Sequence, residues 1–78
     1  MKPNATVITF DDWVVVYVGD NLYEQGHSLH RGRWLEIGRI TSDTKSYYVS
    51  ESQQEEYDLW NMPDRLYNFP QELLVEKS

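Results

Sequence analysis

The side chains with the greatest capacity for chemistry lie close together in the middle of the chain, between positions 27 and 34. His27 and Ser28 supply an imidazole and a hydroxyl, and Arg31 and Arg33 supply guanidinium groups that match phosphate oxygens. Trp34 offers a flat aromatic face on which a base can stack. The set predicts a binding site for a small anionic molecule. The candidate ligand-binding residues, with two further aromatic side chains from earlier in the chain, are His27, Ser28, Arg31, Arg33, Trp34, Trp13 and Tyr17.

Each of these residues also has an ordinary structural reading. The arginines can pair with carboxylates at the surface, Ser28 can simply cap a helix, and Trp13 and Trp34 can belong to the core. The charge distribution favours a site, because residues 27–39 carry three arginines against one glutamate in a chain whose net charge is −6. This basic island suits a small anion, whereas the acidity around it would repel a long nucleic acid.

No residue pattern in the chain specifies catalysis. Cysteine is absent, which removes thiolate nucleophiles and thiolate metal sites. His27 and His30 stand three positions apart but lack the HExxH spacing of a zinc protease, and Ser28 has no nucleophile-elbow sequence around it. The glycines are not spaced as a phosphate loop. We therefore predict a protein that is not an enzyme and has no metal ion or cofactor.

The length of 78 residues predicts a single domain, 1–78, near the lower size at which an ordinary core is sufficient. Without disulfides, extra stability must come from the three Trp, six Tyr and two Phe side chains or from self-association, so we expect a homo-oligomer. No run approaches the roughly 18 apolar residues that span a bilayer. The N-terminal stretch does not read as a signal peptide. These features predict a cytoplasmic protein without membrane contact.

The candidate residues are expected on an α+β fold, a small single domain with an antiparallel β-hairpin or sheet and one or two short helices. The alternation in Ala5–Phe10 predicts a strand with one covered face. The unbroken β-branched and aromatic run Trp13–Val18 predicts a central strand covered on both faces. Residues 19–21 tolerate a positive φ, so Leu22–Gln25 is expected to return as the second strand of a hairpin.

The segment after the hairpin has two readings. The favoured one is a helix over residues 29–37, capped by Ser28 and ended by Gly38, whose free N-terminal amides would help to hold an anion. Gly32 opposes this reading because glycine costs about 1 kcal/mol in a helix interior relative to alanine. The alternative is a strand over Arg33–Thr41 that leads into a further strand.

The second half of the chain is expected to be less regular. Tyr47–Ser50 predicts a short strand, and Gln53–Trp60 predicts one or two helical turns that bring the final tryptophan to the core. Residues 63–69 predict another turn, with Leu66 and Phe69 inward. A last apolar patch is expected at Leu73, Leu74 and Val75.

Two groups of short motifs lie along the chain: Asp12-Trp13, Tyr17-Val18, Asp20, Leu22, Tyr23 and Gly26-His27-Ser28 in the first, and Trp60, Met62-Pro63 and Leu66 within Glu55–Leu66 in the second. They resemble small, uncharacterised bacteriophage proteins, which place an aromatic-rich hairpin before a Gly-His-Ser helix start and then carry an acidic segment with a Trp and a Leu/Met-Pro-x-x-Leu turn. The similarity extends over most of residues 12–66, and the chain departs from it by carrying Gly32 and three basic residues where those proteins have a plainer amphipathic helix. The resemblance implies a phage or prophage origin and no established activity.

Many small phage proteins neutralise host systems, so a phage origin favours a non-enzymatic anti-defence role. The first hypothesis is a sponge, a homo-oligomer that sequesters a small anionic nucleotide immune signal between arginines and aromatic side chains. The second is an acidic inhibitor that occludes a host defence protein or a nucleic-acid-binding enzyme. A third is an accessory virion or regulatory protein. The basic island favours the sponge. The inhibitor would act through Glu51, Glu55, Glu56 and Asp58.

Overall fold

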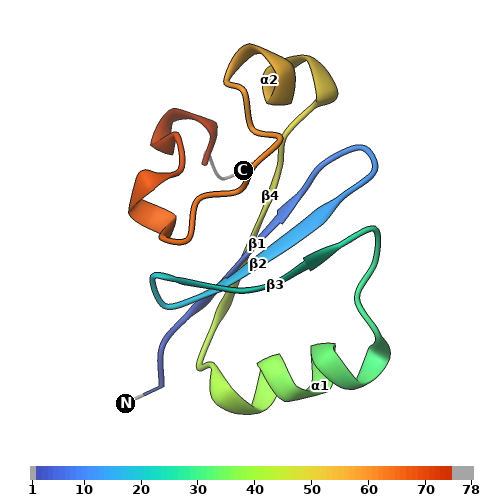
Figure 1. The fold of residues 1–78 in the computed structure, drawn as a ribbon. Coiled ribbons are helices and arrows are strands. Elements are labelled where there is room, and N and C mark those ends of the chain that lie inside the picture. Colours follow the sequence, from blue (N-terminus) through green and yellow to red (C-terminus); the bar gives the residue numbers. More distant parts are fainter. Residues whose placement is uncertain (1, 75–78) are drawn as a thin grey trace.

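A four-stranded mixed sheet forms the middle layer of the protein, with helix α1 on one face and the C-terminal segment on the other (Figure 1). The computed structural model describes residues 2–74. The strand order is β3-β2-β1-β4, which confirms the α+β class predicted from the sequence. The elements are β1 (Ala5–Thr9), β2 (Val14–Val18), β3 (Asn21–Gly26), α1 (Arg31–Ile40), β4 (Thr44–Tyr48), α2 (Glu51–Glu56) and two 3-10 helices, η1 (Leu66–Asn68) and η2 (Gln71–Leu73).

The first three strands form the antiparallel meander that their sequence predicts. β2 pairs with β1 on one side and with β3 on the other, so it is an inner strand, and its first four residues are all buried. Its register with β3 shifts between Val16 and Tyr17. Gly19 has a φ of 61° in the turn between β2 and β3, a conformation that glycine adopts without a steric penalty.

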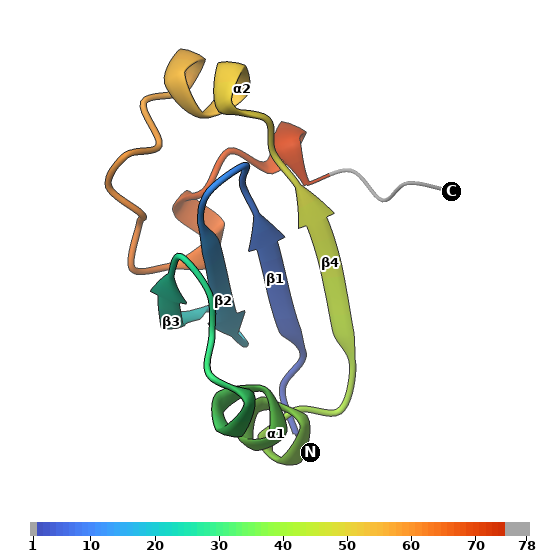
Figure 2. The same ribbon diagram turned by 90° about the vertical axis from the view of Figure 1, so that its right-hand side faces the viewer.

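Strand β4 pairs with β1 in parallel, so the sheet is mixed rather than purely antiparallel. Figure 2 shows the two strands side by side and pointing in the same direction. Parallel neighbours need a crossover connection, and α1 provides it. The alternative strand over Arg33–Thr41 is wrong, because most of these residues belong to α1. The strand expected at Tyr47–Ser50 begins earlier, at Thr44.

Helix α1 begins later than its sequence suggested. His30 is the N-cap, and its side chain accepts a hydrogen bond from the Gly32 amide at 3.1 Å. Ser28 is therefore not the cap. Leu29, which lies between Ser28 and His30, packs against the sheet cluster before the helix begins. Gly38 does not end the helix, which continues to Ile40 and is closed by Thr41.

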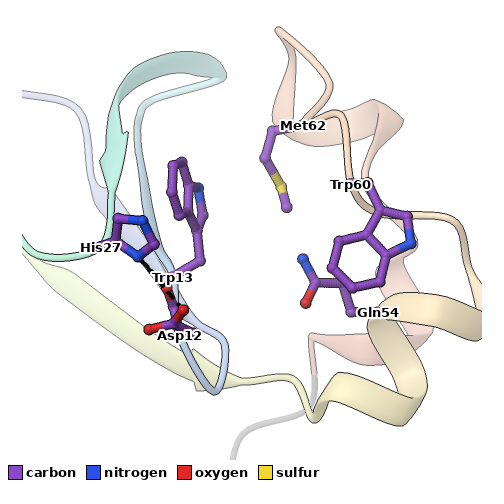
Figure 3. A pocket seen from close by; sticks show the side chains of 6 residues that line it. All are labelled: Asp12, Trp13, His27, Gln54, Trp60 and Met62. Carbon is purple, nitrogen blue, oxygen red and sulfur yellow. Dashed lines mark hydrogen bonds and ion pairs between the residues drawn. The ribbon is translucent and has the colours of Figure 1, made fainter.

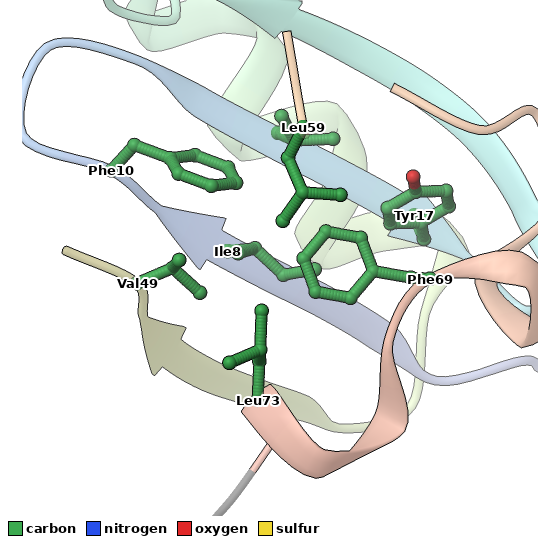
Figure 4. Packing of buried hydrophobic residues seen from close by; sticks show 8 residues of the cluster. Ile8, Phe10, Tyr17, Val49, Leu59, Phe69 and Leu73 are labelled. Atoms are coloured by element: carbon green, nitrogen blue, oxygen red, sulfur yellow. The ribbon is translucent and has the colours of Figure 1, made fainter. Parts of the chain in front are cut away.

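The two faces of the sheet bury separate clusters. Between the sheet and α1 lie Ala5, Val7, Val14 and Val16 from the strands and Ile37 from the helix. The larger cluster lies against the C-terminal segment and is drawn in Figure 4; it consists of Ile8, Phe10, Val15, Tyr17, Val49, Leu59, Phe69 and Leu73. The predicted inward positions of Leu66 and Phe69 are confirmed, since Phe69 is buried and Leu66 packs against the cluster. The predicted apolar patch is formed by Leu73 and Leu74, and Val75 lies outside the described residues.

Helix α2 starts at the capping box that Ser50 and Gln53 make with each other's backbone amides. The helical turns expected over Gln53–Trp60 are therefore shifted towards the N-terminus, and Leu59 rather than Trp60 enters the core. Among residues 2–74, no helix is long and apolar enough to cross a membrane.

Candidate functional site

A pocket of about 310 Å³ lies between the β1–β2 turn, the end of β3 and the segment that begins with α2. Figure 3 shows Trp13 and Trp60 on opposite sides of this pocket, with Met62 and Gln54 between them. We call it the two-tryptophan pocket. Its lining residues are Asp12, Trp13, His27, Gln54, Trp60 and Met62.

Trp13 is held in place by the end of β3. Its indole N–H donates to the Gln25 side-chain oxygen at 3.1 Å, and its ring meets the edge of the His27 ring at a centroid distance of 4.9 Å and an angle of 75°. The carbonyl of Trp13 accepts a hydrogen bond from the Phe10 amide at 2.7 Å, which closes the turn between β1 and β2. Because contacts on two sides fix the ring, this wall is formed before any ligand arrives.

Trp60 is positioned by the residues that end α2. Asp58 adopts a φ of 54°, in the left-handed region, and this turns the chain so that Leu59 enters the core. The buried Gln54 side chain donates to the Leu59 carbonyl at 3.2 Å, and the Leu59 amide donates to the Gln54 carbonyl at 2.8 Å. Trp60 follows directly and remains 57% exposed. Gln54 thus anchors the second wall of the pocket.

The edge of the pocket is acidic. The Asp12 side chain is 92% exposed, and its carboxylate lies 3.6 Å from His27 Nδ1, which also lies 3.0 Å from the Asp12 backbone carbonyl. Its neighbour Asp11 accepts hydrogen bonds from the Tyr48 hydroxyl and from the Glu51 amide, the latter at 3.1 Å. The hydrogen bond to Asp11 raises the pKa of Tyr48. Asp11 therefore ties the β1–β2 turn to the start of α2, the two sides of the pocket.

The two arginines of the predicted basic site, Arg31 and Arg33, differ in their contacts with carboxylates. Arg33 is engaged by two carboxylates, with Nε 3.2 Å from Glu24 and Nη1 3.8 Å from Glu36. Glu36 also accepts a hydrogen bond from Tyr23, and this bond raises the pKa of that tyrosine. Arg31 forms no ion pair with the residues that the structure describes. The surface-pairing alternative thus describes Arg33, whose charge is already balanced.

The other predicted ligand residues separate into three places. Trp13 and His27 come together in the two-tryptophan pocket. Trp34 is 40% exposed on α1, and Ser28 is exposed ahead of that helix. Tyr17 is fully buried in the core, where its hydroxyl donates to the Pro63 carbonyl at 2.8 Å, so it cannot contact a ligand. The anion site expected at the helix start is not formed around Ser28, because the helix begins at Arg31.

Comparison with protein-family models, with curated proteins and with solved structures finds no match. The resemblance to phage proteins therefore stays a prediction that rests on short motifs alone. The homo-oligomer also stays a prediction, which rests on the small size of the chain and its aromatic content. Within residues 2–74, no group of three or more His, Asp or Glu side chains is arranged to hold a metal ion.

Four lining residues were not among the candidates from the sequence. Trp60 was expected in the core, and no sequence pattern predicted a binding role for Asp12, Gln54 or Met62. The available signal was the capping box at Ser50, since it fixes where α2 starts and hence which residue after it points inward.

Proposed function

We propose that this protein is a non-enzymatic binding protein that docks on a partner protein through the two-tryptophan pocket. The observation that carries the proposal is the position of Trp60, which stands 57% exposed across from Trp13 although a core is available beside it. Tryptophan contributes more binding energy at protein interfaces than most residues do, because it buries a large rigid surface. An exposed tryptophan pair around a pocket therefore supports a recognition role.

The size and lining of the pocket favour a side chain over a nucleotide. Ligand pockets span about 300–1,000 Å³, and a volume of about 310 Å³ is at the lower end of that range. Among residues 2–74, no arginine or lysine lines the pocket, so a phosphate would lack the guanidinium or ammonium partner that usually binds it. Of the two functions expected from the sequence, occlusion of a partner protein thus has more support than sequestration of a nucleotide. The resemblance to phage proteins makes a host defence protein the first class of partner to test.

The test is capture of a host protein by the purified, tagged chain, followed by a binding measurement with the captured protein. Trp60→Ala is expected to weaken binding about thirtyfold or more, because interface tryptophans often contribute 2 kcal/mol or more. Its stability should change little, since most of the Trp60 side chain is already exposed.

Tyr67→Ala is the matched control, because Tyr67 is 66% exposed and does not line the pocket. Equal binding by Trp60→Ala and the wild type would refute the proposal. The sponge hypothesis is tested in parallel by thermal shift with cyclic nucleotides and ADP-ribose derivatives. Saturable stabilisation that disappears in Arg31→Ala would restore the sponge in place of the inhibitor.

A further inference from the structure

We infer that the two-tryptophan pocket accepts a cationic side chain, arginine or lysine, from the partner protein. The inference rests on the proposed function and names the chemistry of the group that is bound. Three observations support it: the charge of the two segments that build the pocket, the aromatic walls, and the exposed carboxylate at its edge.

The segments that contribute the lining residues contain no lysine or arginine at all. Residues 3–30 supply Asp12, Trp13 and His27, and residues 46–64 supply Gln54, Trp60 and Met62. Together these two segments hold nine of the 13 acidic residues and none of the seven basic ones. An incoming cation would therefore meet a negative field without a competing lysine or arginine in those segments, and an incoming anion would be repelled.

The walls suit a cation because the face of an indole ring is electron-rich. A guanidinium or ammonium group within about 6 Å of the ring centroid is attracted to that face, and tryptophan binds it best among the aromatic side chains. Figure 3 shows the two indoles on opposite sides of the pocket, so a group that enters it lies between two electron-rich aromatic side chains. Arginine can also stack its planar group on an aromatic ring.

The carboxylate at the edge supplies the matching charge. The Asp12 side chain is 92% exposed, and the one ion pair it makes within residues 2–74 is the 3.6 Å contact with His27, which requires a protonated imidazole. Asp12 is therefore available to an incoming guanidinium or ammonium group. Because Trp13 is already held by Gln25 and His27, binding should require little ordering of that wall.

The experiment titrates the ¹⁵N-labelled protein with a five-residue peptide that has a central arginine and with the same peptide carrying citrulline, which has nearly the same shape and no charge. The three indole N–H signals report the location, with Trp34 on α1 as the internal reference. We expect the arginine peptide to shift the Trp13 and Trp60 signals. Citrulline should bind between about twofold and about thirtyfold more weakly, as a cation–π contribution of about 0.5–2 kcal/mol implies.

Two charge variants provide the matched comparison. Asp12→Asn should weaken arginine binding, whereas Asp43→Asn should not, because Asp43 precedes β4 at the end of that strand away from α2 (Figure 2). Both changes remove one negative charge, so a difference between the two variants in affinity for the arginine peptide measures the effect of the charge at the pocket. Raising the salt concentration should weaken binding to the wild type.

Equal affinities for arginine and citrulline, a shift confined to Trp34, or no shift at about 10 mM peptide would each overturn the inference. Failure of the inference is distinguishable from failure of the proposed function. If partner capture depends on Trp60 while citrulline binds as well as arginine, the docking site stands and its cation preference is wrong. If capture does not depend on Trp60, the docking site itself is wrong.

Discussion

Alkaline pH should weaken the contact between the sheet and the C-terminal segment by acting on Tyr17. Its side chain is fully buried, and its hydroxyl donates to the Pro63 carbonyl at 2.8 Å. Burial, assisted by the charge of Asp64, raises the pKa of Tyr17 from 10.0 to about 12. Folding therefore favours the protonated phenol.

The sign of the effect follows from the order of the two pKa values. Below pH 10 the phenol is protonated in both states, and its contribution to stability is complete. Between pH 10 and about 12 the unfolded chain releases the proton while the folded protein keeps it, so the free energy of unfolding falls by about 1.4 kcal/mol per pH unit. The full loss is about 2–3 kcal/mol, a large share of the stability of a small domain.

Tyr17→Phe removes both the hydrogen bond and the titration. Near pH 7 the variant should be less stable than the wild type by about 1–2 kcal/mol, because the Pro63 carbonyl loses its donor. Near pH 11 the wild type alone has lost about 1.4 kcal/mol through this residue, so the two free energies of unfolding should nearly coincide.

Urea unfolding at a series of pH values, followed by tryptophan fluorescence, measures this convergence. Tyr67→Phe is the control, because the Tyr67 hydroxyl makes no hydrogen bond within residues 2–74. Groups that the wild type and Tyr17→Phe share contribute equally to both free energies, so they cancel in the difference. A constant gap between the wild type and Tyr17→Phe from pH 7 to pH 11 would refute the reasoning.

Five further substitutions test three local features of the fold, each by its effect on the free energy of unfolding in urea. His30→Ala should cost about 1 kcal/mol by removing the N-cap of α1, whereas Ser28→Ala should change stability by less than about 0.5 kcal/mol; the reverse order would restore Ser28 as the cap. Ser50→Ala should cost about 1 kcal/mol because it breaks the capping box of α2, and an unchanged midpoint would show that this box contributes nothing. Gly19→Ala should cost about 1–2 kcal/mol because of its positive φ, while Gly38→Ala, with no atom within 4 Å of the added Cβ, should stabilise α1 by up to about 1 kcal/mol; similar effects at both sites would contradict the backbone argument.

The sequence predicted those parts of the fold that depend on neighbouring residues. The β-branched run of β2 and the permissive residues after it were sufficient to place the hairpin, because strand propensity and turn geometry act over a few positions. The start of α1 was misplaced by two residues, since Ser28 and His30 can both cap a helix and Leu29 between them packs against the sheet cluster. That contact depends on the assembled sheet.

The candidate site was predictable only in part, because its two walls come from opposite ends of the described chain. Trp13 and His27 were recognised as aromatic and polar candidates, but nothing near them in the sequence indicates that Trp60 faces them. The choice between Leu59 and Trp60 as the inward residue depends on the left-handed conformation of Asp58. That conformation gives no local sequence signal as strong as a glycine would.

The parallel pairing of β1 with β4 has a consequence for the order in which the protein assembles. Ala5 pairs with Thr44 and Thr9 with Tyr48, so β1 gains its second neighbour only after half of the chain has been made. Until then the β1–β2–β3 meander exposes both apolar faces and one unpaired inner edge, the conditions that favour aggregation of partly made chains. Closing so long a loop also slows folding, because its entropy is lost before the new contacts form. The rate of folding, and the protection that a nascent chain needs on the ribosome, should therefore depend on how quickly α1 brings β4 to the sheet.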